Sequence, residues 1–161
     1  MPFGGTSQIN AVIDKNLTSG NDSGITLLTR DNTVVDAIIT NNISTNAISN
    51  GFLAEAVGNG SINVSYSNNI ATNSMAHGLF IDDRSTLNIN VDLGGGTLGS
   101  IGNNSILNNT LEEIRVDLDG GELSAENNFF GSAAGLLPAE VLLQDGSTID
   151  ADPFLISDPN L

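Results

Sequence analysis

Four polar residues near the middle of the chain have the types that catalyse glycoside hydrolysis. Asp82 and Asp83 are adjacent, His77 precedes them and Arg84 follows them. Hydrolysis of a glycosidic bond needs two carboxyl groups flanking that bond, one of them held protonated as the acid. The same residue types are typical of a solvated strand end, where acidic and basic side chains pair at the surface. We therefore keep these four residues as candidate catalytic groups, beside the alternative of a surface without activity.

A second acidic cluster lies in a glycine turn and has the ligand type that calcium prefers. Asp117, Asp119 and Glu122 flank two glycines, and carboxylate oxygens are the hard ligands that bind Ca²⁺. The spacing lacks the further acidic positions of an EF-hand loop. Asp92, which precedes another glycine run, is expected one repeat earlier, above Asp117. The alternatives are one structural calcium ion and a plain solvated face, and no other cofactor is expected.

The charge balance excludes several classes of function. The chain has 19 acidic and four basic residues, for a net charge of −15. Nucleic-acid binding is excluded, because it rests on Lys and Arg at the phosphates, and docking on an anionic membrane is disfavoured. Arg84 and Arg115 could supply the base of a polyuronate lyase, but the net charge repels a polyanion unless calcium bridges the two. No apolar run approaches the ~18 residues of a membrane span, so we expect no membrane insertion.

Cysteine is absent, which excludes a disulfide framework, a thiolate metal site and a cysteine nucleophile. The low lysine content and the bias toward Asp, Asn and Gly favour an extracellular or cell-surface setting. The first residues contain no basic segment followed by an apolar one, so no signal peptide is visible. The chain is then either cytosolic or a mature part or excised domain of something longer, and the composition favours the second of these.

Three glycines, each 27 residues after the last, reveal an internal repeat. Gly24, Gly51 and Gly78 each open an apolar segment, and a second apolar segment follows and ends in a polar pair. A third, very short segment comes after each pair. The period lengthens once, where a glycine-rich insertion occupies residues 92–99. Each polar pair contains asparagine; the pairs are 15–16, 41–42, 68–69, 103–104 and 127–128.

The repeat predicts an all-β fold. Apolar residues alternate with polar ones, as at Leu87, Ile89 and Val91, which is the period of a strand. Three short strands per unit of about 27 residues, each paired with the matching strand one unit on, form a parallel β-solenoid of about five to six coils. Asparagine at the turns can adopt a left-handed backbone, and stacked side chains can bond amide to amide along the rod. We expect an N-terminal tail over 1–7, the solenoid over 8–136 and a C-terminal cap or tail over 137–161.

The end of the chain resembles the closing segment of known β-helix proteins. Asn127-Asn128-Phe129-Phe130-Gly131 is similar to the Asn-Asn-Trp-Trp-Gly segment that often closes right-handed parallel β-helix repeat proteins, and Asp152-Pro153-Phe154-Leu155 is similar to the tail that follows it. These are bacterial secreted or surface modules of the pectate-lyase-like fold superfamily. The resemblance implies a right-handed, single-stranded parallel β-helix whose open end is covered by Phe129 and Phe130. It selects no activity, because the group includes lyases, hydrolases, epimerases, tailspikes and adhesins.

The regular coils and the incomplete catalytic cluster favour a non-catalytic structural or adhesive module. A short solenoid with open ends can associate end to end into filaments, since a neighbour can continue an unpaired strand edge. The expected contact segments are Phe3-Gly4-Gly5 and residues 138–161. The alternative is a domain that binds or degrades polysaccharide, as a lyase or a glycoside hydrolase.

Overall fold

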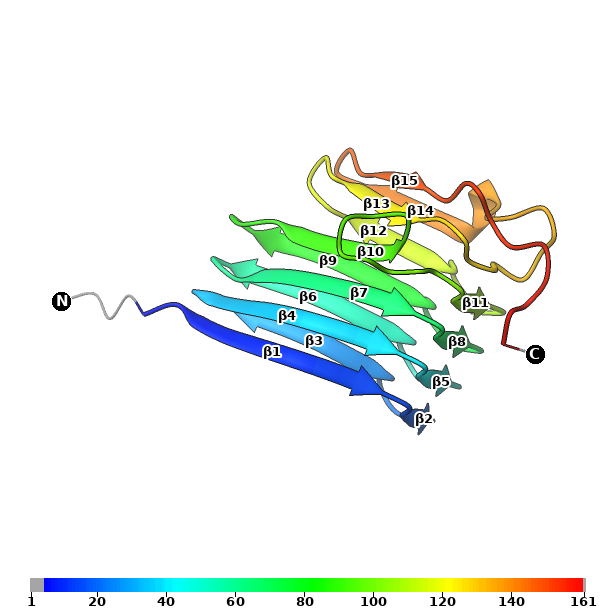
Figure 1. The fold of residues 1–161 in the computed structure, drawn as a ribbon, viewed down its shortest axis with the longest axis horizontal. Helices are drawn as coiled ribbons and strands as arrows, with labels where there is room; N and C mark the ends of the chain where they lie inside the picture. The colour runs from blue at the N-terminus through cyan, green and yellow to red at the C-terminus, as the bar shows by residue number, and fades with distance from the viewer. Residues whose placement is uncertain (1–4, 161) are drawn as a thin grey trace.

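The computed structural model describes residues 5–160 and shows a parallel β-solenoid with three sheets, A, B and C (Figure 1). Sheet A consists of β1 (Ser7–Asp14), β4 (Thr33–Thr40), β7 (Ser61–Ser67), β10 (Ile89–Gly94), β13 (Glu122–Ala125) and β15 (Thr148–Asp150). Sheet B consists of β2 (Leu17–Ser19), β5 (Ile43–Thr45), β8 (Ile70–Thr72) and β11 (Ser105–Leu107). Sheet C consists of β3 (Ile25–Arg30), β6 (Phe52–Gly58), β9 (Leu79–Ser85), β12 (Ile114–Asp117) and β14 (Val141–Gln144).

Each full coil contributes one strand to each sheet, and every strand pairs in parallel with its equivalent in the next coil. Ala37 of β4 lies opposite Val64 of β7, which is a separation of one 27-residue repeat. The all-β fold, the parallel pairing and the repeat length are thus confirmed. Among the described residues the one helical element is a 3₁₀ turn, η1 (Pro138–Glu140), and no helix there is long and apolar enough to cross a membrane.

The core lies inside the coils and is mainly aliphatic. Alternate side chains of each strand point inward, so Ile39 of β4, Ile62 of β7 and Ile81 of β9 are fully buried. Phe130 is also buried and belongs to the same apolar cluster. Its position in the fifth coil agrees with the expectation that it covers the core near the C-terminal end.

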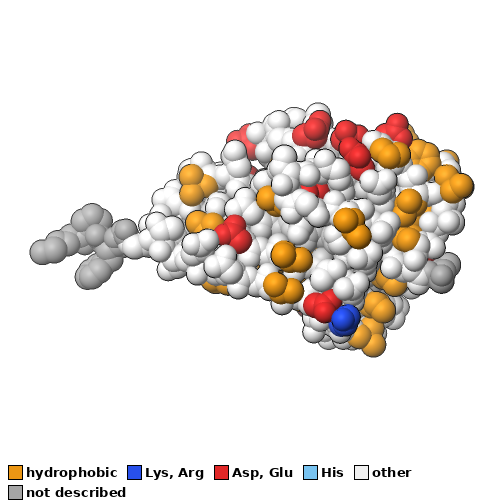
Figure 2. Space-filling model, viewed as in Figure 1, with side chains coloured by type: hydrophobic (Ala, Val, Ile, Leu, Met, Phe, Trp, Pro, Cys, Tyr) orange, Lys and Arg blue, Asp and Glu red, His pale blue; other side chains and the backbone are white. Residues whose placement is uncertain are grey.

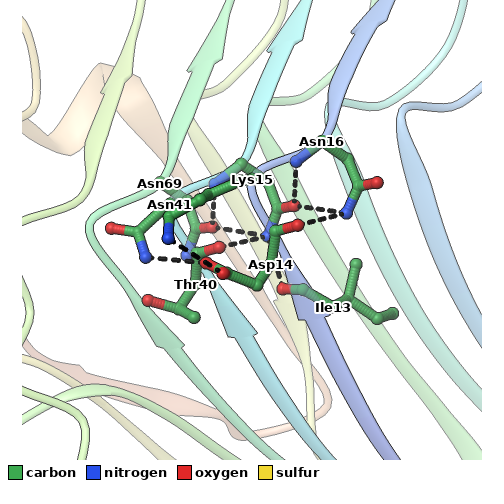
Figure 3. A network of polar contacts seen from close by, with 8 residues as sticks. Ile13, Asp14, Lys15, Asn16, Thr40, Asn41 and Asn69 are labelled. Atoms are coloured by element: carbon green, nitrogen blue, oxygen red, sulfur yellow. Dashed lines mark hydrogen bonds and ion pairs between the residues drawn. The ribbon is translucent and has the colours of Figure 1, made fainter.

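The two residues of each polar pair between sheets A and B have different structural roles. The first residue has a left-handed backbone, with φ between 55° and 60° at Lys15, Asn41, Asn68, Asn103 and Asn127. The second residue forms a ladder of asparagines. In this ladder the Oδ1 of each asparagine accepts both the backbone N–H and the Nδ2–H of the asparagine one coil before it, as Figure 3 shows around Asn16. The five rungs are Asn16, Asn42, Asn69, Asn104 and Asn128.

Asp92 does not lie above Asp117, and that expectation was wrong. Asp92 belongs to sheet A, opposite Ser65 and Ser124, whereas Asp117 belongs to sheet C. The Asp92 side chain is buried and accepts hydrogen bonds from four backbone N–H groups of its own loop, at Gly94, Gly96, Leu98 and Ser100. These bonds take the place of the hydrogen bonds to water that burial removes from the carboxylate. Asp92 therefore fixes the backbone of the glycine-rich insertion.

Residues 137–161, expected as a cap or tail, contribute two strands to the solenoid. β14 pairs in parallel with β12, and β15 pairs in parallel with β13. The remainder of the segment folds over the end of sheet B, where the Leu155 N–H donates to the Asn128 carbonyl oxygen. β14 therefore completes the fifth coil, β15 begins a sixth, and the residues that follow, up to 160, form a covering loop.

Tyr66 provides a first prediction about this core. Its side chain is fully buried, its ring lies 5.7 Å from the Phe52 ring, and no described protein group bonds its hydroxyl. Because an unpaired buried hydroxyl costs stability, Tyr66→Phe is expected to raise the free energy of unfolding by about 1 kcal/mol. Urea unfolding followed by circular dichroism measures the change. A lower stability of Tyr66→Phe would show that the hydroxyl is hydrogen-bonded in solution.

Candidate functional site

The structure keeps Asp82 and Arg84 together on one face and directs Asp83 and His77 elsewhere. Asp82 and Arg84 alternate with the buried Ile81 on β9 and therefore point to the outer face of sheet C. Asp83 instead closes the turn between β9 and β10, where it accepts hydrogen bonds from the N–H groups of Ser85 and Ile89. Two adjacent carboxylates with opposite orientations do not flank one bond. Asp83 is thus placed as a turn-forming residue.

His77 is buried at the corner that precedes β9. Its side chain packs against the Phe80 ring, with ring centroids 5.6 Å apart, and its Nδ1 lies 3.1 Å from Glu112 Oε2. Burial is the largest influence on the imidazole and lowers its pKa, while the Glu112 carboxylate acts in the opposite direction. Only 5% of His77 is exposed, so a ligand on the outer face does not reach it.

A column of three carboxylates crosses the outer face of sheet C. The strand register places Glu55, Asp82 and Asp117 opposite one another on β6, β9 and β12, and adjacent strands lie about 4.8 Å apart. Arg84 forms ion pairs with two of these carboxylates; its Nε lies 3.1 Å from Asp82 Oδ2, and its Nη2 contacts Glu55. Like charges at this spacing repel, and the guanidinium relieves that repulsion.

Arg115 adds a second guanidinium and an aromatic ring to the same face. Its Cζ lies 4.4 Å from the centre of the Phe80 ring, which is a cation–π geometry. Its Nε and Nη2 donate to Gln144 Oε1 over 3.0 and 2.5 Å. Arg115 was a candidate from the sequence, whereas Phe80 and Gln144 were not. The alternation along β9, which places Phe80 on the same side as Asp82, is the signal that could have found the ring.

Two carboxyl groups of this face have raised pKa values. Burial raises the pKa of Asp82, although the Arg115 guanidinium acts in the opposite direction. Burial also raises the pKa of Asp117, and the neighbouring Asp145 carboxylate raises it further. We refer to Glu55, Phe80, Asp82, Arg84, Arg115 and Asp117 as the sheet C face.

The three calcium candidates lie on different parts of the coil. Asp117 is on the outer face of β12, Asp119 has a left-handed backbone with φ 46° in the turn, and Glu122 begins β13 in sheet A. In residues 5–160 no three metal-ligating side chains converge closely enough to hold an ion.

No protein-family model matches the chain, and searches of the curated proteins and of the solved structures also gave no match. The solenoid fold is shown by its strand pairing, whereas no relative assigns the chain to the pectate-lyase-like superfamily.

Glu113 occupies the position that glycine holds in earlier coils. The Leu79 N–H donates to the Glu113 carbonyl oxygen. One coil earlier, the Phe52 N–H donates in the same way to the Gly78 carbonyl oxygen. The Glu113 side chain is buried, and its carboxylate accepts a hydrogen bond from Asn109 Nδ2. Burial raises the pKa of Glu113, and the Asn109 bonds only partly oppose this effect.

This environment predicts a pH-dependent effect of Glu113→Gln. A carboxyl group with a raised folded pKa costs stability above that pKa, and the cost vanishes below its unfolded pKa, where both states are protonated. Glu113→Gln keeps an acceptor for Asn109 and is expected to be more stable than the parent at pH 7.5, with the gain lost toward pH 4. Thermal unfolding at the two pH values measures this, with the exposed Glu122→Gln as control. Equal gains at both pH values would contradict the prediction.

Proposed function

We propose that this chain is a non-catalytic structural or adhesive module of an extracellular or cell-surface protein, a right-handed parallel β-helix that associates end to end. The main support is that side chains with catalytic chemistry are engaged in building the coils. Asp92 and Asp83 bind backbone N–H groups of their own turns, and His77 is buried beside Glu112. The asparagine ladder uses five further polar side chains.

The closing segment supports placement among the right-handed parallel β-helix repeat proteins. The two parts that resemble their C-terminal pattern, residues 127–131 and 152–155, bind each other here, although residues 132–151 separate them in the chain. The Asn127 N–H donates to the Pro153 carbonyl oxygen, and the Leu155 N–H donates to that of Asn128. Such modules are found at bacterial surfaces, which is the setting that we propose for this chain.

Light scattering after size exclusion tests the association. A mass above 16.6 kDa that falls on dilution is the expected result, with electron micrographs of the same fractions. The same measurement with a calcium chelator tests whether Ca²⁺ binds at the contact between associated ends or at the Asp117–Glu122 turn. A constant monomer mass at every concentration would refute end-to-end association.

The sheet C face supports a second candidate, the binding or cleavage of polysaccharide. An aromatic ring, two guanidinium groups and carboxyl groups with raised pKa on one flat surface can contact a sugar ring and its hydroxyls. Retention on immobilised neutral and uronate polysaccharides is the test for binding, and release of reducing ends or unsaturated uronides is the test for cleavage. Arg115→Ala should reduce retention, whereas Asn160→Ala at the C-terminal loop should not. Absence of both retention and product would reject this candidate.

A further inference from the structure

Among residues 5–160, the strands of the first coil form one edge of each of the three sheets. β1, β2 and β3 are the terminal strands of sheets A, B and C, and each pairs on one side only with a described strand. The inward-facing Ile9 is 51% exposed, whereas its in-register partners Val35 and Ile62 are 5% and 0% exposed. Core side chains and strand edges are therefore presented together at this end, which we call the N-terminal end.

The edge of β1 lacks the usual protection against pairing. Exposed edge strands commonly carry charges, proline or a bulge that keep other strands away. β1 runs for eight residues in unbroken register with β4, and from Ser7 to Ile13 it carries neither charge nor proline. Such an edge can accept another strand along most of its length.

The opposite end is partly covered by its own chain. The loop after β15 binds the last turn of the asparagine ladder through Pro153 and Leu155. Asn160 Nδ2 donates to the Asn103 carbonyl oxygen and to Ser105 Oγ, at the end of sheet B. A second copy that stacked head to tail would have to displace this loop.

Charge further distinguishes the two ends. Residues 101–161 contain eleven of the 19 acidic residues and one basic residue, whereas residues 1–50 contain four acidic and two basic residues. In Figure 2 the acidic side chains gather over the C-terminal coils at the top of the view. Two C-terminal ends repel each other, while two N-terminal ends approach with little opposing charge.

We propose that the occupant of the N-terminal end is the same end of a second copy, so that association closes as a two-fold dimer. This inference rests on the proposed end-to-end association and decides which ends meet. A two-fold axis makes the two β1 strands antiparallel, and an isologous contact of this kind does not propagate. If the antiparallel pairing is centred on Ala11, Ile9 of each copy lies opposite Ile13 of the other, since both are two residues from Ala11. Directly opposed residues point to the same face, so both side chains face the core side. The exposed Ile9 and the half-buried Ile13 are thereby covered.

Single-cysteine cross-linking tests the arrangement, because the parent chain has no cysteine. Ala11→Cys marks the N-terminal end and Ser157→Cys marks the exposed loop at the C-terminal end. Under mild oxidation or with a short bifunctional maleimide, Ala11→Cys is expected to form a covalent dimer of twice the monomer mass. Ser157→Cys alone, and a mixture of the two variants, should give no additional cross-linked species. In scattering, the unmodified chain should reach a dimer and no larger species.

A charge at the open end supplies a matched perturbation. Ile9→Lys should shift the dimer to monomer with unchanged circular dichroism, whereas Thr86→Lys, far from the N-terminal end, should not. Cross-links between Ala11→Cys and Ser157→Cys, or masses beyond a dimer, would show head-to-tail stacking and overturn the inference while keeping end-to-end association. A monomer at all concentrations would overturn both.

Discussion

Asn69→Ala is expected to lower the free energy of unfolding by about 3 kcal/mol, because it removes a central rung of the asparagine ladder. Asn69 Oδ1 accepts the backbone N–H and the Nδ2–H of Asn42, and Asn69 Nδ2 donates to Asn104 Oδ1 and to the Ile39 carbonyl oxygen. The site is dry, since 1% of Asn69 is exposed. Alanine leaves the Asn42 N–H buried without an acceptor, and an unsatisfied buried donor costs more than the bond itself contributed.

Asn16→Ala is the matched control, because Asn16 is the exposed first rung. It donates to Asn42 Oδ1, and within residues 5–160 no donor depends on its own Oδ1. Its replacement is expected to cost about 0.5–1 kcal/mol. Urea denaturation gives both values. If the two variants lose the same stability, the ladder does not act through buried donors, and the prediction is wrong.

Gly51→Ala is expected to cost about 2–3 kcal/mol through overpacking between coils. A Cβ atom at Gly51 would lie 2.6 Å from the Gly78 carbonyl oxygen and 2.9 Å from Ala71 Cβ. The first contact is with the backbone of the next coil and the second with a buried side chain, so neither can move away cheaply. The backbone angle at Gly51 is not in the left-handed region, and the cost therefore arises from space alone.

Gly5→Ala separates this effect from the general consequences of replacing glycine. A Cβ atom there meets no atom within 4 Å, and the backbone is also outside the left-handed region. We expect no loss of stability for Gly5→Ala. Alanine lowers the conformational entropy of the unfolded chain, and this favours the folded state. Thermal unfolding of both variants is the measurement. A Gly51→Ala protein as stable as Gly5→Ala would mean that the coils are spaced more loosely than the structure shows.

The sequence by itself predicted the strands and their parallel pairing. Gly24, Gly51 and Gly78 recur because a Cβ atom there would contact the neighbouring coil where the chain enters sheet C, and this demand repeats until Glu113 takes the equivalent position before β12. The alternating apolar residues recur because every strand has one inward face, and the asparagine pairs recur because every coil has the same turn between sheets A and B. A solenoid makes such prediction possible, since each coil contacts only its neighbours and meets nearly the same environment.

The tertiary structure decided which polar groups meet. Asp117 lies opposite Asp82 although 35 residues separate them, because the insertion after Asp92 delays the next coil. The sequence also offered Asp82 and Asp83 as a pair, whereas alternation along β9 and the following turn direct them apart. Side-chain chemistry alone does not show whether a carboxylate faces solvent or its own backbone. That choice depends on the register between coils and on the number of N–H groups that the fold leaves unpaired, and both arise only when the coils stack.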